Sequence, residues 1–199
     1  MVAAPRPAHA AFSSNGSSAK VTGISAPMAD PSAEMLSAIG GFSLAWSMLE
    51  MGLDLCVMMV FHHFGGKEMG VAPRALSSKI KLLRKCIVKA EGLRPYCAQI
   101  TGLLRRVNEM TEFRHQVTHG VASSSENGDA LIFVRIIHDD NGFHTAQTQV
   151  ITSAKVLASW TETRALAHEA LSIGLTLASS VAPPGFYDDI DNTFGKLRI

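Results

Sequence analysis

Residues 39–64 have the sequence IGGFSLAWSMLEMGLDLCVMMVFHHF, in which Glu50 and Asp54 are the only acidic residues and no Lys or Arg occurs. The stretch is long enough to cross a bilayer, but each acid at mid-membrane would cost about 2.5–3.5 kcal/mol. We therefore expect a helix buried in a bundle or a dimer, and no membrane association. Because Glu50 and Asp54 lie one turn apart, the same helix predicts a polar or cationic partner for both.

Hydrophobic periodicity predicts three further helices. Glycines follow each of the first three helices, and Ser153 is placed to cap the fourth. The apolar stripe of the third helix continues onto Arg114 and Val117, which predicts a guanidinium on a buried face. The apolar stripe of the fourth helix includes Leu157, Trp160, Ala167, Leu171 and Leu175. The predicted helices cover residues 31–64, 73–90, 93–119 and 153–182.

A change of pattern separates the third and fourth helices. Residues 130–137 are mostly β-branched or aromatic, and the DDNG sequence at 139–142 is typical of a hairpin turn. The predicted fold class is all-α, a four-helix up-down bundle with an inserted β-hairpin at about residues 130–151. This domain spans residues 31–182, between a flexible N-terminal tail (1–30) and a C-terminal tail (183–199).

Composition sets the compartment and the domain count. A chain of 199 residues with 47% hydrophobic and 18% charged residues is globular and long enough for one core. Cys56, Cys86 and Cys97 are odd in number, widely spaced and set in apolar helices, which favours reduced core thiols and a cytoplasmic location. The N-terminal tail has no continuous apolar segment of the roughly 7–15 residues that a signal peptide needs.

Positive charge is concentrated in the second and third helices. Between Arg74 and Arg106 the chain has nine Lys or Arg residues and one acid, Glu91, although the whole chain has a net charge of only +1. Such segregation favours a surface that contacts phosphates, for which Lys85, Arg105 and Arg106 are the candidate substrate-binding residues. A solvated helix face is the alternative.

The heptapeptide RHQVTHG at residues 114–120 is the most reactive segment. Arg114 offers a permanently charged fork that can hold a phosphate, and His115 and His119 exchange protons near neutral pH. His115 and His119 are one turn apart on one face, whereas Arg114 points to a neighbouring face. The three side chains can therefore line a common groove only where it wraps around the end of the helix.

This segment resembles the motif of the HEPN superfamily, in which an Arg is followed after four to six residues by a His late in the third helix of a bundle. The acid-bearing segment WSMLE at residues 46–50 is also similar to the first helix of bacterial HEPN proteins. The resemblance covers roughly residues 33–178 and is interrupted by the hairpin. Many members have Asn directly after the Arg, where this chain has His115.

The resemblance implies an RNA-binding or RNA-cleaving protein of the toxin or defence type, acting as a homodimer and paired with an antitoxin-like protein. His119 would be general base or acid at a ribose 2′-hydroxyl, Arg114 would hold the phosphate, and His115 would orient phosphate or water. Such cleavage leaves a 2′,3′-cyclic phosphate and needs neither metal nor other cofactor.

Two other interpretations fit the same residues. Arg114 paired with Glu50 or Asp54 would pin two helices together in a non-catalytic helical dimer, with His119 stabilising the end of its helix. The spacing of Glu112, His115 and His119 also resembles half of a di-iron site, but no second half-site follows, so we expect no metal.

Overall fold

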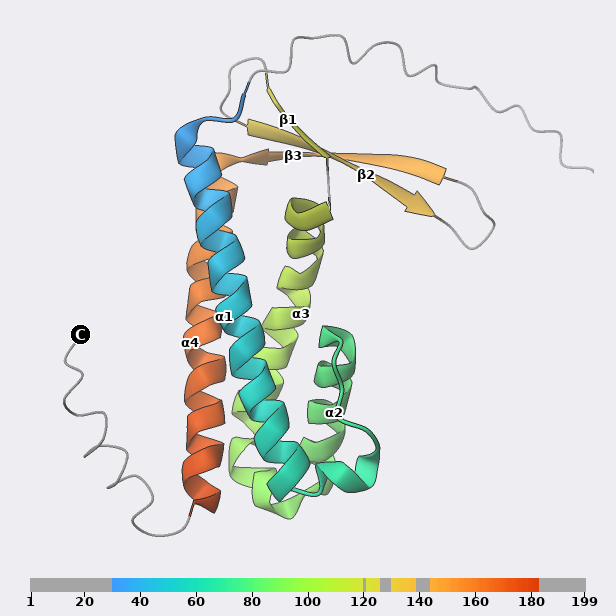
Figure 1. The fold of residues 1–199 in the computed structure, drawn as a ribbon, viewed down its shortest axis with the longest axis vertical. Coiled ribbons are helices and arrows are strands. Elements are labelled where there is room, and N and C mark those ends of the chain that lie inside the picture. Colours follow the sequence, from blue (N-terminus) through green and yellow to red (C-terminus); the bar gives the residue numbers. More distant parts are fainter. Residues whose placement is uncertain (1–29, 120, 126–129, 139–143, 183–199) are drawn as a thin grey trace, which may run out of the picture.

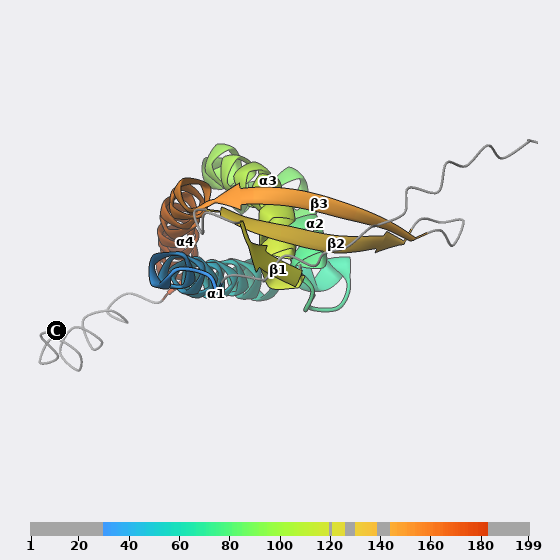
Figure 2. The ribbon, with the colours of Figure 1, turned by 90° about the horizontal axis from the view of Figure 1, so that it is seen from above.

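The computed structural model describes residues 30–119, 121–125, 130–138 and 144–182. It contains four α-helices, with a three-stranded antiparallel sheet across one end of the bundle (Figure 1 and Figure 2). Apart from Asp30, both predicted tails lie outside the described residues. The elements are α1 (Ala33–His63), η1 (Gly66–Met69), α2 (Leu76–Lys89), η2 (Glu91–Tyr96), α3 (Cys97–His119), β1 (Val121–Ser124), β2 (Ala130–His138), β3 (His144–Thr152) and α4 (Ser153–Val181).

The helices start where local chemistry allows. The Ser32 hydroxyl accepts a hydrogen bond from the Met35 N–H and caps α1, and Thr152, rather than the predicted Ser153, caps α4. The predicted third helix divides into η2 and α3, since Pro95 lacks an N–H and restricts the residue before it.

Helices α1 and α4 are closely packed along their length. A Cβ atom added to Gly41 would lie 2.5 Å from the Trp160 ring, and one added to Gly52 would lie 2.8 Å from the Ala170 Cβ. Later residues of α1 therefore meet later residues of α4, so the two helices run parallel, as Figure 1 shows.

The up-down order that the sequence predicts is wrong at the first connection. Lys79 of α2 meets Asp54 of α1, and Lys89 and Ala90 at the far end of α2 lie beside Phe64. Helix α2 is thus parallel to α1, because η1 and the segment after it carry the chain back along the bundle before α2 begins (Figure 1). The start of α2 consequently lies beside the middle of α1.

The sheet confirms the predicted hairpin and adds a strand. Strand β2 pairs with β3 in a register that joins Ala130 to Thr152 and His138 to His144, while the turn itself lies outside the described residues. Strand β1 was not predicted, because Val-Ala-Ser-Ser is short and has no alternating apolar pattern. Buried side chains of β2 and β3, Leu131, Phe133 and Ile151, close the upper end of the core.

The buried faces of α3 and α4 differ from those predicted. On α3, Phe113 and Gln116 are buried and Arg114 is only half-buried, so the stripe passes one residue to the side of the guanidinium. Phe113 packs edge-on against Phe42, with ring centroids 5.0 Å apart. On α4, Leu157 and Leu175 are exposed, and the neighbouring Val156 and Leu177 are buried instead.

Helix α1 is the one helix in the described ranges that is long and apolar enough to cross a membrane. Half of its most apolar window is buried inside the molecule, mainly by packing on α4. Core helices of bundles have the same length and composition, so the apolar character of α1 does not distinguish a membrane span from a core helix.

Candidate functional site

The three reactive side chains of the heptapeptide lie together at the end of α3, next to the sheet. Arg114 Nη1 and His119 Nε2 are 3.3 Å apart, within hydrogen-bonding distance. The rings of His115 and His119 are stacked with centroids 5.8 Å apart. Arg114 and His115 are half-buried, whereas His119 is exposed. The end of the helix therefore brings the guanidinium and the exposed imidazole together, but of the three side chains only Arg114 and His115 line the hollow beside this site.

A hollow of about 430 Å³ opens beside Arg114 and His115. It lies between the middle of α1, the start of α2 and the late part of α3. Its lining residues are Glu50, Arg74, Ala75, Leu76, Ser77, Ile80, Asn108, Thr111, Arg114 and His115. Two guanidinium groups therefore belong to one hollow, together with amide and hydroxyl groups that suit an oxyanion and with one carboxylate, that of Glu50.

The start of α2 adds to the positive character of this hollow. No side chain caps the helix at Ala75, whose carbonyl oxygen accepts the first bonds, from Ser78 and Lys79. The first N–H groups of a helix carry a partial positive charge and attract anions when no side chain satisfies them. They reinforce the attraction that Arg74 and Arg114 exert on an anion.

Arg114 does not pin α3 to α1 through an acid. Among the described residues no ion pair joins it to Glu50 or Asp54. Glu50 accepts a hydrogen bond from Trp46 Nε1 at 2.8 Å, and Asp54 pairs with Lys79 at 2.5 Å. Both acids thus have the polar partners that were expected, but neither partner is Arg114, and the predicted structural clamp is absent.

Arg114 also lines a second hollow of about 180 Å³ on the other side, shared with Trp46, Glu50 and Thr118. Its guanidinium therefore separates two open spaces, and its one bond inside the described structure is to His119. A cation in this position is accessible to a ligand from either space.

The predicted substrate-binding residues have different surroundings. Arg105 pairs with Glu109 at 2.7 Å, and Arg106 pairs with Glu169 and, at 3.8 Å, with Glu162. Both arginines are therefore neutralised by neighbouring acids and lie away from Arg114 along α3. Lys85 is exposed on α2 and lines other hollows.

Arg74 is the residue of this hollow that sequence reasoning did not single out. It was one of nine cations in a basic segment, and its position beside Arg114 depends on the parallel course of α1 and α2. The parallel direction of the two helices depends on packing around the connection between them. Hydrophobic periodicity in the sequence does not predict this packing.

The cysteine thiols are protected by burial. Burial raises the pKa of Cys56 to about 12, and its Sγ donates a weak hydrogen bond to the Ala170 carbonyl oxygen. Burial also raises the pKa of Cys86, although Lys85 acts in the opposite direction. Thiolates are the reactive form, so neither residue is suited to nucleophilic chemistry. In the described ranges no group of three or more His, Cys, Asp or Glu side chains could hold a metal ion.

This arrangement can bind an oxyanion between guanidinium groups and exchange a proton at an adjacent imidazole. Phosphate esters combine both requirements, since they carry charge and react through proton transfer at oxygen. Comparison of the chain with protein-family models, curated proteins and solved structures found no match.

Proposed function

We propose that this protein binds RNA and cleaves it as a metal-independent endoribonuclease of the HEPN type. The observation that carries the proposal is the contact of Arg114 with His119 at 3.3 Å, at the edge of a hollow that also holds Arg74 and His115. A phosphodiester held by the guanidinium would place its neighbouring ribose within reach of the imidazole.

Each residue has a role in this reaction. His119 takes the proton of the ribose 2′-hydroxyl, whose oxygen then forms a bond to phosphorus. The bond from phosphorus to the 5′-oxygen breaks, the 5′-oxygen takes a proton from water, and a 2′,3′-cyclic phosphate remains. Arg114 stabilises the charge that develops on the phosphate oxygens. His115 orients the phosphate, and Arg74 is a second cation for it.

The site is proposed to act in a homodimer that brings two copies of the motif to one cleft. An exposed apolar row on α1 supports this: Leu44, Met51 and Met58 recur every seven residues and are 65%, 55% and 46% exposed. Exposed apolar rows of this kind mark protein contacts. The proposal also includes a cytoplasmic location, because the cysteines are free thiols. It includes an antitoxin-like protein partner because of the HEPN resemblance.

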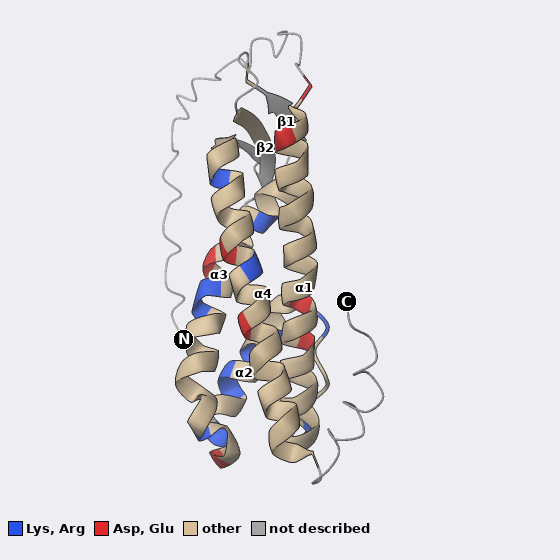
Figure 3. Cartoon of the chain, turned by 90° about the vertical axis from the view of Figure 1, so that its left-hand side faces the viewer, with Lys and Arg blue, Asp and Glu red and all other residues tan. Residues whose placement is uncertain are grey.

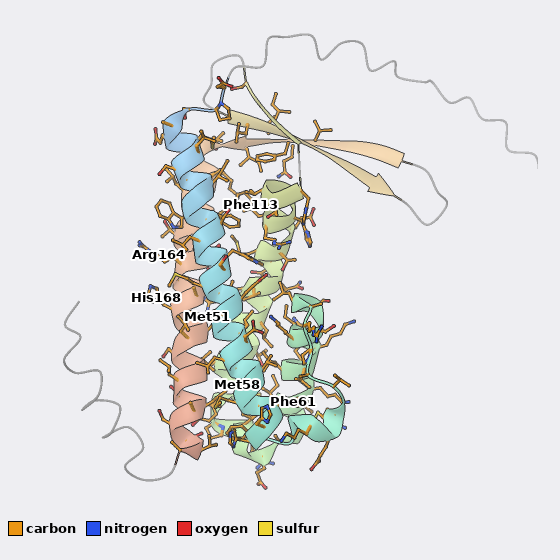
Figure 4. All side chains as sticks on the ribbon, in the orientation of Figure 1. Met51, Met58, Phe61, Phe113, Arg164 and His168 are labelled. Atoms are coloured by element: carbon orange, nitrogen blue, oxygen red, sulfur yellow. The ribbon has the colours of Figure 1, made fainter. Side chains whose placement is uncertain are left out.

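The test is decay of a mixed-sequence RNA in the presence of EDTA, with wild-type protein and an Arg114→Ala, His119→Ala variant. We expect the variant to lose activity by about a hundredfold or more, because it lacks both the charge stabiliser and the proton acceptor. A matched control is Arg164→Ala, His168→Ala, which removes the same residue types from the exposed surface of α4 (Figure 4). This control should retain full activity.

The alternative is a non-catalytic helical dimer. It predicts equal RNA decay for the wild type and both variants, because Arg114 and His119 would then be structural. The one observation in its favour is that His119 lies in the last turn of α3, where a cation stabilises the helix end. The missing pair between Arg114 and Glu50 or Asp54 favours the nuclease.

A further inference from the structure

The cations without an acidic partner are concentrated on α2 and just before it. Nine Lys or Arg residues lie between Arg74 and Arg106. Ion pairs hold four of them, Lys79, Arg94, Arg105 and Arg106. Within the described part of the chain the other five form none, and all are exposed. These five are Arg74, Lys81, Arg84, Lys85 and Lys89.

Three of these cations form a row along one side of α2. Lys81, Lys85 and Lys89 are spaced four residues apart, which is a rise of about 6 Å for each step. Like charges at this spacing repel one another and destabilise a helix. The repulsion between these lysines decreases when anions at a similar spacing bind beside them.

Arg74, just before the start of α2, places a further cation at the hollow beside Arg114. Lys81 and Lys85 line a second hollow of about 220 Å³, and Lys85 and Lys89 line a third of about 250 Å³, in which Glu68 is the one acid. Three cation-lined depressions thus follow one another from the start of α2 to its end. Figure 3 shows how unevenly charge is distributed: α1 carries acids and no Lys or Arg.

We propose that the exposed side of α2 is a track for the backbone of single-stranded RNA, which enters the hollow at Arg114 at one end and leaves past Lys89 at the other. This inference rests on the proposed function, of which it specifies the substrate class. One row of cations fits the phosphates of one strand. Lysines act as point charges and carry no base readout, so the track binds RNA without sequence preference.

An anionic membrane surface fits this side of α2 less well. A helix that lies in the membrane interface presents apolar side chains to the lipid. The large apolar residues of α2, among them Ile80, Leu83 and Ile87, are buried in the core. The side of α2 that carries the lysines also has Ser77 and Ser78, and its exposed large apolar residues are Val88 and, beside the hollow of Lys81 and Lys85, Val71, which are too few for an apolar face.

The test measures binding of a fluorescently labelled single-stranded oligouridine over a series of salt concentrations. The variant is Lys81→Gln, Lys85→Gln, and its matched control is Lys155→Gln, Arg164→Gln on α4, which removes the same charge from an exposed surface away from α2 (Figure 4). Loss of two phosphate contacts should reduce the slope of log K against log salt by about 1.4 and weaken binding by roughly tenfold. The control should match the wild type.

The outcomes separate the track from the nuclease. A reduced slope in the α2 variant supports the track even where the wild type does not cleave RNA, a result that would refute only the nuclease. Equal slopes for the wild type, the variant and the control would overturn the track, whether or not RNA is cleaved. Loss of binding to phosphatidylglycerol vesicles, with RNA binding unchanged, would also overturn it in favour of a membrane surface.

Discussion

At the scale of single residues, the environment of a side chain determines whether it is chemically available. Arg114 is half-buried between two hollows and contacts His119, so its charge is open to a ligand. Arg106 has the same guanidinium but is held by two acids of α4. The same distinction applies to the thiols, since Cys56 and Cys86 are buried and Cys97 is partly exposed.

We predict that iodoacetamide at about pH 8 modifies Cys97 before Cys56 and Cys86 in the folded protein. The pKa of Cys56 is raised to about 12, so almost none of this thiol is ionised at that pH, and burial also raises the pKa of Cys86. Peptide mass spectrometry measures the order of modification. In denaturant the three rates should become similar, and fast labelling of Cys56 in the folded protein would contradict the burial described above.

The sequence predicted which residues form the candidate site better than it predicted the contacts of those residues. The segment from Arg114 to His119 was recognised from its residue types, and the structure places these two side chains in contact. The partners of Glu50 and Asp54 were anticipated as polar, but not as Trp46 and Lys79. Lys79 comes from another helix, so its pair with Asp54 follows only once the packing is known, whereas Trp46 and Glu50 lie four residues apart on the same helix.

At the scale of elements, small residues determine how closely α1 approaches α4. Gly52 is buried where a side chain would meet Ala170 and the Leu171 backbone, whereas a Cβ at Gly40 would meet nothing within 4 Å. The four helices and the hairpin follow from periodicity and capping signals. The directions of the helices do not follow from these signals, because the same amphipathic α2 could pack in either direction beside α1.

Two of the three glycines of α1, Gly40 and Gly52, provide a matched pair of substitutions. Gly52→Ala should reduce the free energy of unfolding by about 1–3 kcal/mol, since the new methyl group would lie 2.8 Å from the Ala170 Cβ and 2.9 Å from the Leu171 amide nitrogen. Gly40→Ala should raise it by about 0.5–1 kcal/mol, because alanine loses less backbone entropy in a helix. Urea denaturation measures both values. Equal stability of the two variants would show that α1 and α4 are not in close contact.

At the scale of the whole molecule, the bundle presents two different surfaces. One is the cationic side of α2, with the hollow at Arg114 beside the start of this helix, and the other is the apolar row of Leu44, Met51 and Met58 on α1. Sequence alone located the basic segment but not which of its cations remain unpaired. For Lys79 and Arg106 that distinction depends on acids of α1 and α4 that only the folded chain brings near, whereas Arg105 and Glu109 are four residues apart on one helix.

The homodimer proposed to form at the apolar row predicts that a single charge there changes the oligomeric state. Met51→Glu should convert a homodimer into a monomer, because it would bury an unpaired carboxylate in the interface. Light scattering coupled to size-exclusion chromatography measures the mass. Leu175→Glu, at an exposed apolar residue of α4, is the matched control and should remain dimeric. A monomeric wild type, or dissociation by the Leu175 variant alone, would refute an interface at this row.

The nature of the RNA ends tests the proposed chemistry most directly. Wild-type protein and the Arg114→Ala, His119→Ala variant are incubated with a defined single-stranded RNA in EDTA, and the product ends are identified by mass spectrometry. Attack by the ribose 2′-hydroxyl at the Arg114 and His119 site predicts 2′,3′-cyclic phosphate ends that form with the wild type and almost disappear with the variant. Ends with a 3′-hydroxyl, or cyclic phosphates formed equally by both proteins, would contradict this mechanism.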